Sequence, residues 1–234
     1  MLKSQTLADI IYMKIKEEIV ELELRPGEKL SEVQLAKKFQ VSRAPVRDAV
    51  RKLHQDNLVL VKPQIGTIVS PISLEKAMNI CELRLLLEPY AAEIAARNIT
   101  ESDQNLLNEQ FLQLDLYVGE TKRKCVHETD LMLHRTILRL SGNKELYRII
   151  DRYTDEINRI KRATAKLANR LAPTEQEMRE IYNALRQKNP QAAKEAMQLH
   201  ITNLTKAIER ALMEEKAISD LEPEGGDGTR ESAN

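Results

Sequence analysis

The chain of 234 residues is poor in helix breakers and in aromatic residues, with 7 glycines, 8 prolines, 2 phenylalanines and no tryptophan. It has no apolar run near the roughly 20 residues that a membrane-spanning helix requires. The first residues, MLKSQTLADI, contain no hydrophobic signal segment. Its two cysteines, Cys81 and Cys125, form no CxxC pair, which favours reduced core thiols over the alternative of a disulfide. We therefore expect a cytoplasmic, mainly helical protein that does not enter a membrane.

An excess of charge of one sign is also lacking, because 36 Lys and Arg balance 36 Asp and Glu. The balance is not uniform along the chain. Residues 1–70 hold 12 basic and 9 acidic residues, whereas the tail from Glu214 onward has a net charge of −5. Residues 37–52 alone carry six cations against the single carboxylate of Asp48. One basic segment on a neutral body is typical of a protein that binds nucleic acid.

The first seventy residues predict a winged helix-turn-helix. Residues 10–20 and 31–39 space their apolar side chains as helices do, and Ser42 is a natural cap for a third helix. Two β-rich pieces, residues 58–62 and 67–70, follow and are joined by a Pro-Gln-Ile-Gly turn. Three helices followed by a two-stranded hairpin make this fold, with the hairpin as its small wing.

The third predicted helix separates apolar and basic side chains. Its arginines, Arg43, Arg47 and Arg51, recur every four positions, whereas its apolar side consists of Val46, Val50 and Leu53. A helix of this kind fits the major groove of DNA, and arginine forms bidentate hydrogen bonds with guanine. Ser42 and the first backbone amides could hold a phosphate, and the small Ala44 permits close approach to a base. The alternative is a basic helix face that is only solvated.

The motifs LRPGEKLSE, LAKKF, VSRAPVRDA and GTIV, in an ungapped stretch of about sixty residues, resemble the DNA-binding domain of GntR-family bacterial transcription regulators. The resemblance implies that Ser42, Arg43, Ala44 and Arg47 contact DNA and that Gly66 of the wing approaches the minor groove. To these predicted DNA-binding residues we add two basic residues of the same segment, Lys37 and Arg51. This sequence departs from the family at Val33, where many relatives carry an arginine, so a different or shorter operator is expected.

Residues 71–73 form a predicted linker, and residues 74–215 contain helical patterns only. Six helices are expected, over residues 74–97, 101–118, 121–140, 144–170, 174–188 and 190–215. Helices of this length predict an all-α antiparallel bundle with sites between facing helices. The acidic, glycine-rich tail over residues 216–234 is expected to be disordered. The fold class is therefore mainly α, with a winged helix-turn-helix before the bundle.

Three segments of the predicted bundle, LRLLLEPYAAEIAA, TDLMLHRTILRLSGNKEL and AAKEAMQLH, resemble the FCD ligand-binding domain that follows the winged helix in one branch of GntR regulators. Six helices rather than seven are similar to the VanR-type subgroup of that branch. The resemblance implies a homodimer that binds a small carboxylate or another metabolite.

Asp130 and His134 are four residues apart and therefore share one face of a helix, where both could bind one ion. The family pattern that they resemble adds two histidines 22 positions apart; His200 matches one of them, but the other position is Met178. Asp130, His134 and His200 could hold Zn, Ni or Mn, with water or the effector completing the shell, or they could line a polar pocket that binds its ligand directly. His127, one turn from Asp130, is either a substitute ligand or a surface histidine.

Arg84 matches the arginine that precedes the Leu-Glu pair of the first FCD helix. The resemblance makes Arg84 an effector contact, together with Met178 at the substituted position; the alternative for Arg84 is a surface ion pair with Glu88. Leucines 83, 86 and 87 are expected in the core.

The sequence therefore predicts a dimeric DNA-binding regulator, a repressor, that is controlled by a small carboxylate. Two other classes stay open. One is an all-helical metal hydrolase that uses Asp130, His134 and His200, and the other is a DNA-binding module without an effector.

Overall fold

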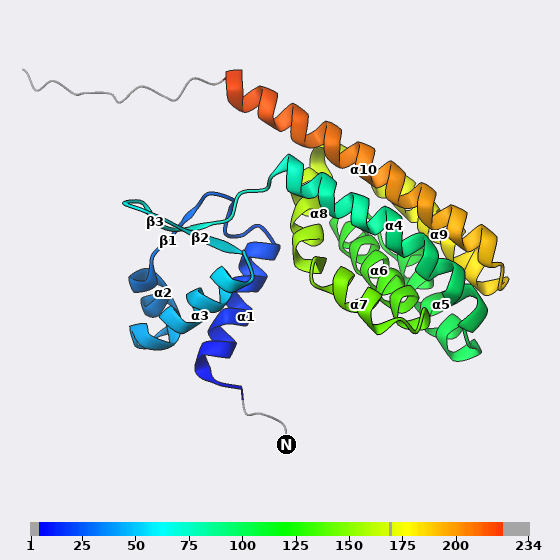
Figure 1. Ribbon diagram of the computed structural model, residues 1–234, viewed down its shortest axis with the longest axis horizontal. Coiled ribbons are helices and arrows are strands. Elements are labelled where there is room, and N and C mark those ends of the chain that lie inside the picture. The colour runs from blue at the N-terminus through cyan, green and yellow to red at the C-terminus, as the bar shows by residue number, and fades with distance from the viewer. Residues whose placement is uncertain (1–4, 169, 222–234) are drawn as a thin grey trace, which may run out of the picture.

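The computed structural model describes residues 5–168 and 170–221 of the chain (Figure 1). Its N-terminal elements are α1 (Leu7–Val20), β1 (Lys29–Leu30), α2 (Glu32–Phe39), α3 (Arg43–Gln55), β2 (Val59–Lys62) and β3 (Gly66–Val69). The three strands form one antiparallel sheet in the order β1-β3-β2. The predicted winged helix-turn-helix is confirmed, and β1 is an addition to it. A strand of two residues is too short to show an alternating pattern.

The apolar face of α3 closes the core of this N-terminal unit. Val46 and Leu53 are fully buried, and they pack in one cluster with isoleucines of α1 and with Leu35 of α2. Asn57 follows the helix with φ +58°, so it takes the left-handed conformation that an asparagine tolerates. The predicted apolar side of the helix is therefore confirmed, and its basic side faces away from the core.

The remaining elements are all helices: α4 (Leu74–Asn98), α5 (Glu101–Leu116), α6 (Gly119–Leu140), α7 (Lys144–Asp151), α8 (Thr154–Ala168), α9 (Leu171–Arg186) and α10 (Pro190–Leu221). The prediction of one helix over residues 144–170 is wrong, because the chain turns at Arg152 and Tyr153 between α7 and α8. No glycine or proline marks this turn. The described part of the bundle therefore has seven helices, and the count of six that suggested the VanR-type subgroup does not hold.

Small residues let α4 and α10 pack closely along most of their length. These two helices run antiparallel and side by side in Figure 1. Four alanines of α4 are fully buried in the main core cluster, and α10 adds Ala193, Met197 and Ile201 to it. Because alanine side chains end at Cβ, the two backbones can approach closely.

Cys81 and Cys125 are free and buried, as expected. Leu86 is not a core residue, since it is 68% exposed. Helix α10 continues to Leu221, six residues beyond the predicted end of the last helix, and the rest of the predicted tail lies outside the described residues. Among the described helices, none is both long and apolar enough to cross a membrane.

Candidate functional site

The basic face of α3 is open to solvent. Arg43, Arg47 and Arg51 are all exposed, as are Ser42 and Ala44 at the start of the helix. Arg47 lies 3.6 Å from a carboxylate oxygen of Glu32, and Arg51 lies 3.3 Å from Asp48. Ion pairs between exposed side chains contribute little, typically about 0–1 kcal/mol. Both arginines can therefore exchange these partners for a phosphate or a base.

The first turn of α3 leaves hydrogen-bond donors unused by its own cap. Ser42 is the N-cap residue with extended backbone angles, but its hydroxyl accepts no capping hydrogen bond. By contrast, the hydroxyl of Ser31 at the start of α2 accepts from the backbone N–H of Gln34 at 3.4 Å. The hydroxyl of Ser42 and the first amides of α3 are thus free to bind an anion.

The wing tip also lies on the surface. Gly66 begins β3 with φ +99°, a conformation that a side chain would strain, and Lys29 lies 3.6 Å from where its Cβ would be. Gly66 and Lys62 are exposed, as is Lys37 on α2. The structure therefore places on the surface every residue that the sequence predicted to contact DNA.

A second group of polar residues lies inside the bundle. Asp130 and His134 project from α6 and His200 from α10, and all three residues are at least 94% buried. The two histidine Nε2 atoms are 3.2 Å apart. Asp130 Oδ1 lies 3.5 Å from Nε2 of His134 and 3.3 Å from Nε2 of His200. Among the described residues, Asp130 Oδ1 has no hydrogen-bond partner.

These three atoms fit a small divalent cation. Nitrogen and oxygen ligands held about 2.0–2.2 Å from one ion at tetrahedral angles lie roughly 3.3–3.6 Å from one another, close to the spacing of the Asp130, His134 and His200 atoms. A buried carboxylate oxygen without a partner is costly, and a cation would satisfy it. The side chains that are present therefore suit the metal that the sequence predicted, with three protein ligands.

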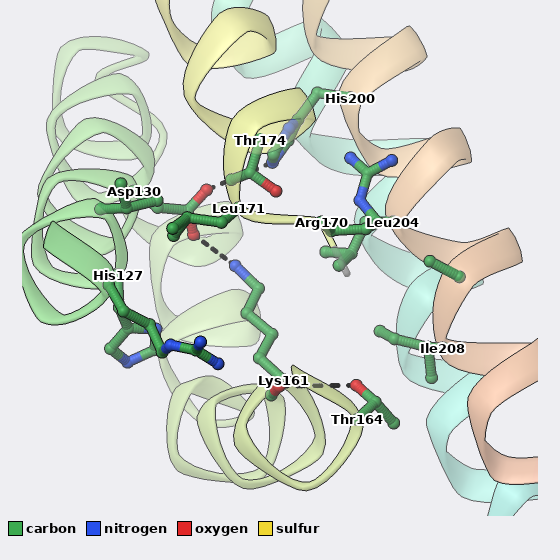
Figure 2. A pocket seen from close by; sticks show the side chains of 13 residues that line it. His127, Asp130, Lys161, Thr164, Arg170, Leu171, Thr174, His200, Leu204 and Ile208 are labelled. Carbon is green, nitrogen blue, oxygen red and sulfur yellow. Dashed lines mark hydrogen bonds and ion pairs between the residues drawn. The ribbon is translucent and has the colours of Figure 1, made fainter. Parts of the chain in front are cut away.

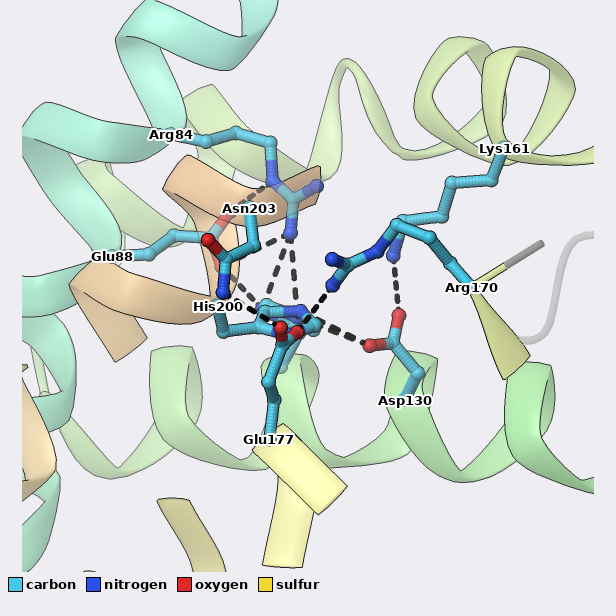
Figure 3. A network of polar contacts seen from close by, with 9 residues as sticks. Arg84, Glu88, Asp130, Lys161, Arg170, Glu177, His200 and Asn203 are labelled. Carbon is cyan, nitrogen blue, oxygen red and sulfur yellow. Dashed lines mark hydrogen bonds and ion pairs between the residues drawn. The ribbon is translucent and has the colours of Figure 1, made fainter. Parts of the chain in front are cut away.

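Carboxylates from two more helices surround the histidines (Figure 3). Glu88 of α4 contacts Nδ1 of His134, and Glu177 of α9 lies 2.9 Å from Nδ1 of His200. Asn203 of α10 donates to the other oxygen of Glu177 at 2.9 Å. Each ring nitrogen that faces away from Asp130 therefore has a carboxylate partner.

Three cations balance the carboxylates. Arg84 pairs with Glu88 at 2.5 Å, Lys161 of α8 contacts Asp130, and Arg170 contacts Glu177. Three positive and three negative side chains thus share the interior. A divalent cation would leave this group with surplus positive charge, which favours an anionic ligand nearby.

The surroundings shift the ionisation of these groups. Burial alone would raise the pKa of Asp130, but Lys161 and His134 hold that pKa well below its ordinary value. Burial alone would lower the pKa of His134, but the carboxylates of Glu88 and Asp130 raise it. For Lys161, burial outweighs the attraction of Asp130 and lowers the pKa. The carboxylates thus stabilise positive charge at the point where the ligand atoms meet.

A cavity of about 120 Å³ opens beside Asp130 and His200 (Figure 2). Its polar lining includes Arg123, Lys161 and Arg170, and its apolar lining is Val126, Leu171, Leu204, Ala207 and Ile208. An apolar cavity of about 150 Å³ admits a benzene ring, so this space suits a ligand of roughly that size. Three cationic side chains at an apolar cavity favour a small anion with a hydrocarbon part.

His127 lines this cavity and is half-buried. Burial, together with the charges of Lys161 and Arg162, lowers its pKa to about 4. His127 is therefore neutral near pH 7. It does not belong to the group of Asp130, His134 and His200 whose ligand atoms converge.

Two predicted effector contacts lie elsewhere. Arg84 is 3% exposed, so its pair with Glu88 is buried rather than on the surface, and it also approaches His134 at 3.3 Å. Met178 is fully buried in the apolar core because it faces the side of α9 away from the polar group. Neither residue lines the 120 Å³ cavity. We assign Arg84 to the ion network and Met178 to the core.

Sequence reasoning missed four members of this network: Glu88, Lys161, Arg170 and Glu177. Each is an ordinary charged residue in or next to a helix, and the sequence gives no sign that it is buried. The spacing of Arg84 and Glu88 was visible, but the same spacing also describes an exposed pair.

Family models match both parts of the chain. The model described as bacterial regulatory proteins, gntR family, matches residues 7–69. The model of the FCD domain matches residues 79–203, which is more than half of the chain. The matches cover the winged helix and the bundle that holds the polar group.

Full-length relatives agree with these matches. The chain is 30% identical over 203 residues to the HTH-type transcriptional regulator LutR of Bacillus subtilis, which covers 78% of this chain and 92% of the relative. It is 26% identical over 214 residues to the HTH-type transcriptional repressor RspR of Escherichia coli, covering 90% and 92%. A solved GntR regulator of Rhodococcus sp. RHA1 has the same fold, with a TM-score of 0.73 and 20% identity over 86% of this chain and 96% of that one. The chain therefore belongs to the gntR family of bacterial regulatory proteins, a family of DNA-binding transcription regulators rather than enzymes, and it carries an FCD domain.

Proposed function

We propose that this regulator is a cytoplasmic, homodimeric repressor whose affinity for operator DNA falls when a small carboxylate binds in the FCD domain beside a divalent cation. The observation that carries the proposal is the cavity whose cationic lining adjoins Asp130 and His200. The family and its FCD domain support the general assignment. The narrower VanR-like subgroup has lost its basis in the helix count, so the proposal stays at the level of the FCD domain.

Operator recognition is assigned to α3 and the wing. Arg43 and Arg47 would read base edges in the major groove, with Ala44 close to a base, while Ser42 and the first amides of α3 hold a phosphate. Arg51 and Lys37 would contact the backbone further along, and Gly66 would allow the wing to approach the minor groove. The exposure of all these residues supports the assignment.

The effector would lie in the 120 Å³ cavity. Arg123, Lys161 and Arg170 would bind its carboxylate, neutral His127 would offer a hydrogen bond, and the leucines and Ile208 would contact its apolar part. Asp130, His134 and His200 would hold the cation, which supplies a Lewis-acidic centre for an anionic ligand when bound. Three protein ligands leave a coordination position free for the effector or water. The polar interior argues against a module without an effector.

Helix α8 connects this cavity to the DNA-binding domain. Lys161 contacts Asp130, whereas Asp155 and Arg162 of the same helix pair with Lys16 and Glu21 of the N-terminal domain, each at 2.5 Å. A ligand that draws Lys161 away from Asp130 therefore acts on a rigid element that also touches the winged helix. Moving α8 would change the placement of α3 and hence the fit to two operator half-sites.

Replacing Arg162 with alanine is expected to reduce the response to ligand. It removes the ion pair between α8 and Glu21, the residue that follows α1, so the factor by which ligand lowers operator affinity should shrink by roughly 2- to 5-fold. Fluorescence anisotropy of a labelled operator, with and without a carboxylate found by thermal-shift screening, measures this factor. Arg148→Ala, which breaks the exposed pair with Glu145 on α7, is the control; an equal effect in both variants would contradict the role of α8.

The dimer surface is assigned to an apolar stripe on the outside of the bundle. Leu86 and Tyr90 lie one turn apart on α4 and are 68% and 50% exposed, and Leu199 of α10 is 51% exposed. Apolar side chains in such a row are usually covered by a partner. A two-fold dimer would match a pseudo-palindromic operator, and sedimentation equilibrium without DNA would show twice the mass of the chain.

The whole proposal is tested by selecting duplexes from a random pool and measuring their affinity with and without ligand. We expect one selected pseudo-palindromic sequence whose affinity falls by roughly 5- to 150-fold when ligand binds. If no small carboxylate changes that affinity, the effector assignment is wrong. If no duplex is selected, the assignment of α3 to the operator is wrong as well.

A further inference from the structure

Each histidine of the proposed metal site is backed by a carboxylate from a different helix. Glu177 of α9 lies 2.9 Å from Nδ1 of His200, and Glu88 of α4 contacts Nδ1 of His134. In a neutral imidazole only one nitrogen carries the proton. A proton shared between Nδ1 and a carboxylate leaves Nε2 as the acceptor, and in His134 this atom also lies 3.3 Å from the guanidinium of Arg84. Both Nε2 atoms are the ones that face Asp130.

The two carboxylates are themselves fixed. Oε1 of Glu177 accepts from Asn203 at 2.9 Å and its Oε2 contacts Arg170, while Glu88 is held by Arg84 at 2.5 Å. Both glutamates are at least 92% buried. Because neither carboxylate can turn to another partner without leaving a buried cation or amide unpaired, each restricts the rotation of the histidine in front of it.

We infer that Glu177 and Glu88 are positioning residues that orient His200 and His134 toward a shared cation, and that α9 acts on the site through Glu177 from outside the ligand shell. The inference rests on the metal site proposed above. Met178, which stands where the family pattern has a histidine, faces the apolar core, whereas the preceding residue, Glu177, reaches His200. Helix α9 thus contributes orientation in place of a fourth ligand.

Loss of such an outer partner usually lowers metal affinity by roughly 10- to 100-fold. Glu177→Gln is the informative change, since glutamine has the same shape as glutamate but lacks the charge. Glu177 is preferred to Glu88 because its cationic partner, Arg170, is 16% exposed, whereas the partner of Glu88, Arg84, is 3% exposed. We expect the affinity of the intact protein for Zn²⁺ alone, measured by competition with a chromophoric chelator, to fall by that factor. His200→Ala should abolish binding.

Glu175→Gln is a matched control on the same helix. Glu175 is also an ion-paired glutamate, with Lys122 and Arg179 at 2.8 Å, and its side chain is 17% exposed against 10% for Glu177. It has no contact with either histidine among the described residues. Its removal should leave the affinity for Zn²⁺ within about 2-fold of the unchanged protein, as expected for an exchange that does not touch the ligands.

The absorption spectrum of bound Co²⁺ separates orientation from a general loss of stability. A turned His200 alters the ligand field and hence the visible bands at saturation, whereas a partly unfolded protein binds less Co²⁺ but gives the same bands. We expect altered bands in Glu177→Gln and unaltered bands in Glu175→Gln. If Glu177→Gln does not fold, Glu177→Asp, which keeps the charge but is one methylene shorter, is judged by the same two measurements.

Unchanged affinity in Glu177→Gln, or reduced affinity with unaltered bands, would overturn the positioning role while the metal site itself stands. Binding of Zn²⁺ by His200→Ala as tight as in the unchanged protein would instead overturn the proposed metal site. The two failures are therefore distinguishable.

Discussion

Replacing Arg47 with alanine is expected to weaken operator binding by roughly 5- to 150-fold, which corresponds to about 1–3 kcal/mol, and to relax base preference at one position in each half-site. Arg47 extends from the first turns of α3 with 68% of its side chain exposed, and its nearest carboxylate, on Glu32, lies 3.6 Å away. The guanidinium is therefore available for bidentate hydrogen bonds to guanine. Binding isotherms against the selected operator and single-base variants of it measure both effects.

Lys37→Ala provides the contrast. Lys37 is an exposed residue of α2, assigned to the phosphate backbone, and a phosphate contact carries no base information. Loss of this side chain should weaken binding to all duplexes by the same factor and reduce the slope of log affinity against log salt concentration by about 1. Base preference would be unchanged. If Arg47→Ala bound the operator as tightly as the unchanged protein does, α3 would not be the element that reads the major groove.

The DNA-binding half could be predicted closely because its signals are local. The N-cap residue Ser42 and the apolar spacing of α3 lie within one or two turns of the residues that they position. The sequence contains no signal for strand β1, because two residues cannot show the alternation of apolar and polar side chains that indicates a strand. Strand β1 exists because Lys29 and Leu30 pair with Thr67 and Ile68 of β3, a long-range contact.

The bundle was harder to predict because its helices are recognised by composition. Composition does not show where one helix ends and the next begins, or which face of a helix is covered by its neighbours. The turn at Arg152 and Tyr153 has no glycine or proline. Leu86 fits the pattern of a core residue, but no other helix among the described residues covers it, and it is 68% exposed. Helix packing, which the local sequence does not encode, determines whether such a leucine is covered.

The buried ion site was predictable only in part. Histidine is scarce in this chain, with 4 residues, so the spacing of His134 from Asp130 was conspicuous. Glutamate is common, so it does not stand out in the sequence. Glu88 is 46 positions from His134 in the chain, and Glu177 is 23 positions from His200. A buried glutamate becomes recognisable only when the folded chain shows which cation and which ring it meets.

Replacing Arg84 with methionine is expected to lower the free energy of unfolding by about 3–5 kcal/mol, because it leaves a buried carboxylate without its cation. The side chains of Arg84 and Glu88 are 3% and 1% exposed, and Arg84 Nε lies 2.5 Å from Glu88 Oε1. Burial alone would raise the pKa of Glu88, but Arg84 and His134 together lower it. Urea denaturation followed by circular dichroism measures the loss.

The same helix contains a matched control. Arg97 pairs with Glu93 at the same spacing and at 2.6 Å, but these side chains are 53% and 22% exposed, so Arg97→Met should cost less than about 1 kcal/mol. If Arg84→Met and Arg97→Met lower the free energy of unfolding by the same amount, burial does not determine the effect. The double replacement of Arg84 and Glu88 by methionine identifies the cause. A carboxylate left unpaired would be relieved in the double variant, which should then be more stable than Arg84→Met alone, whereas lost packing around the arginine would persist in both.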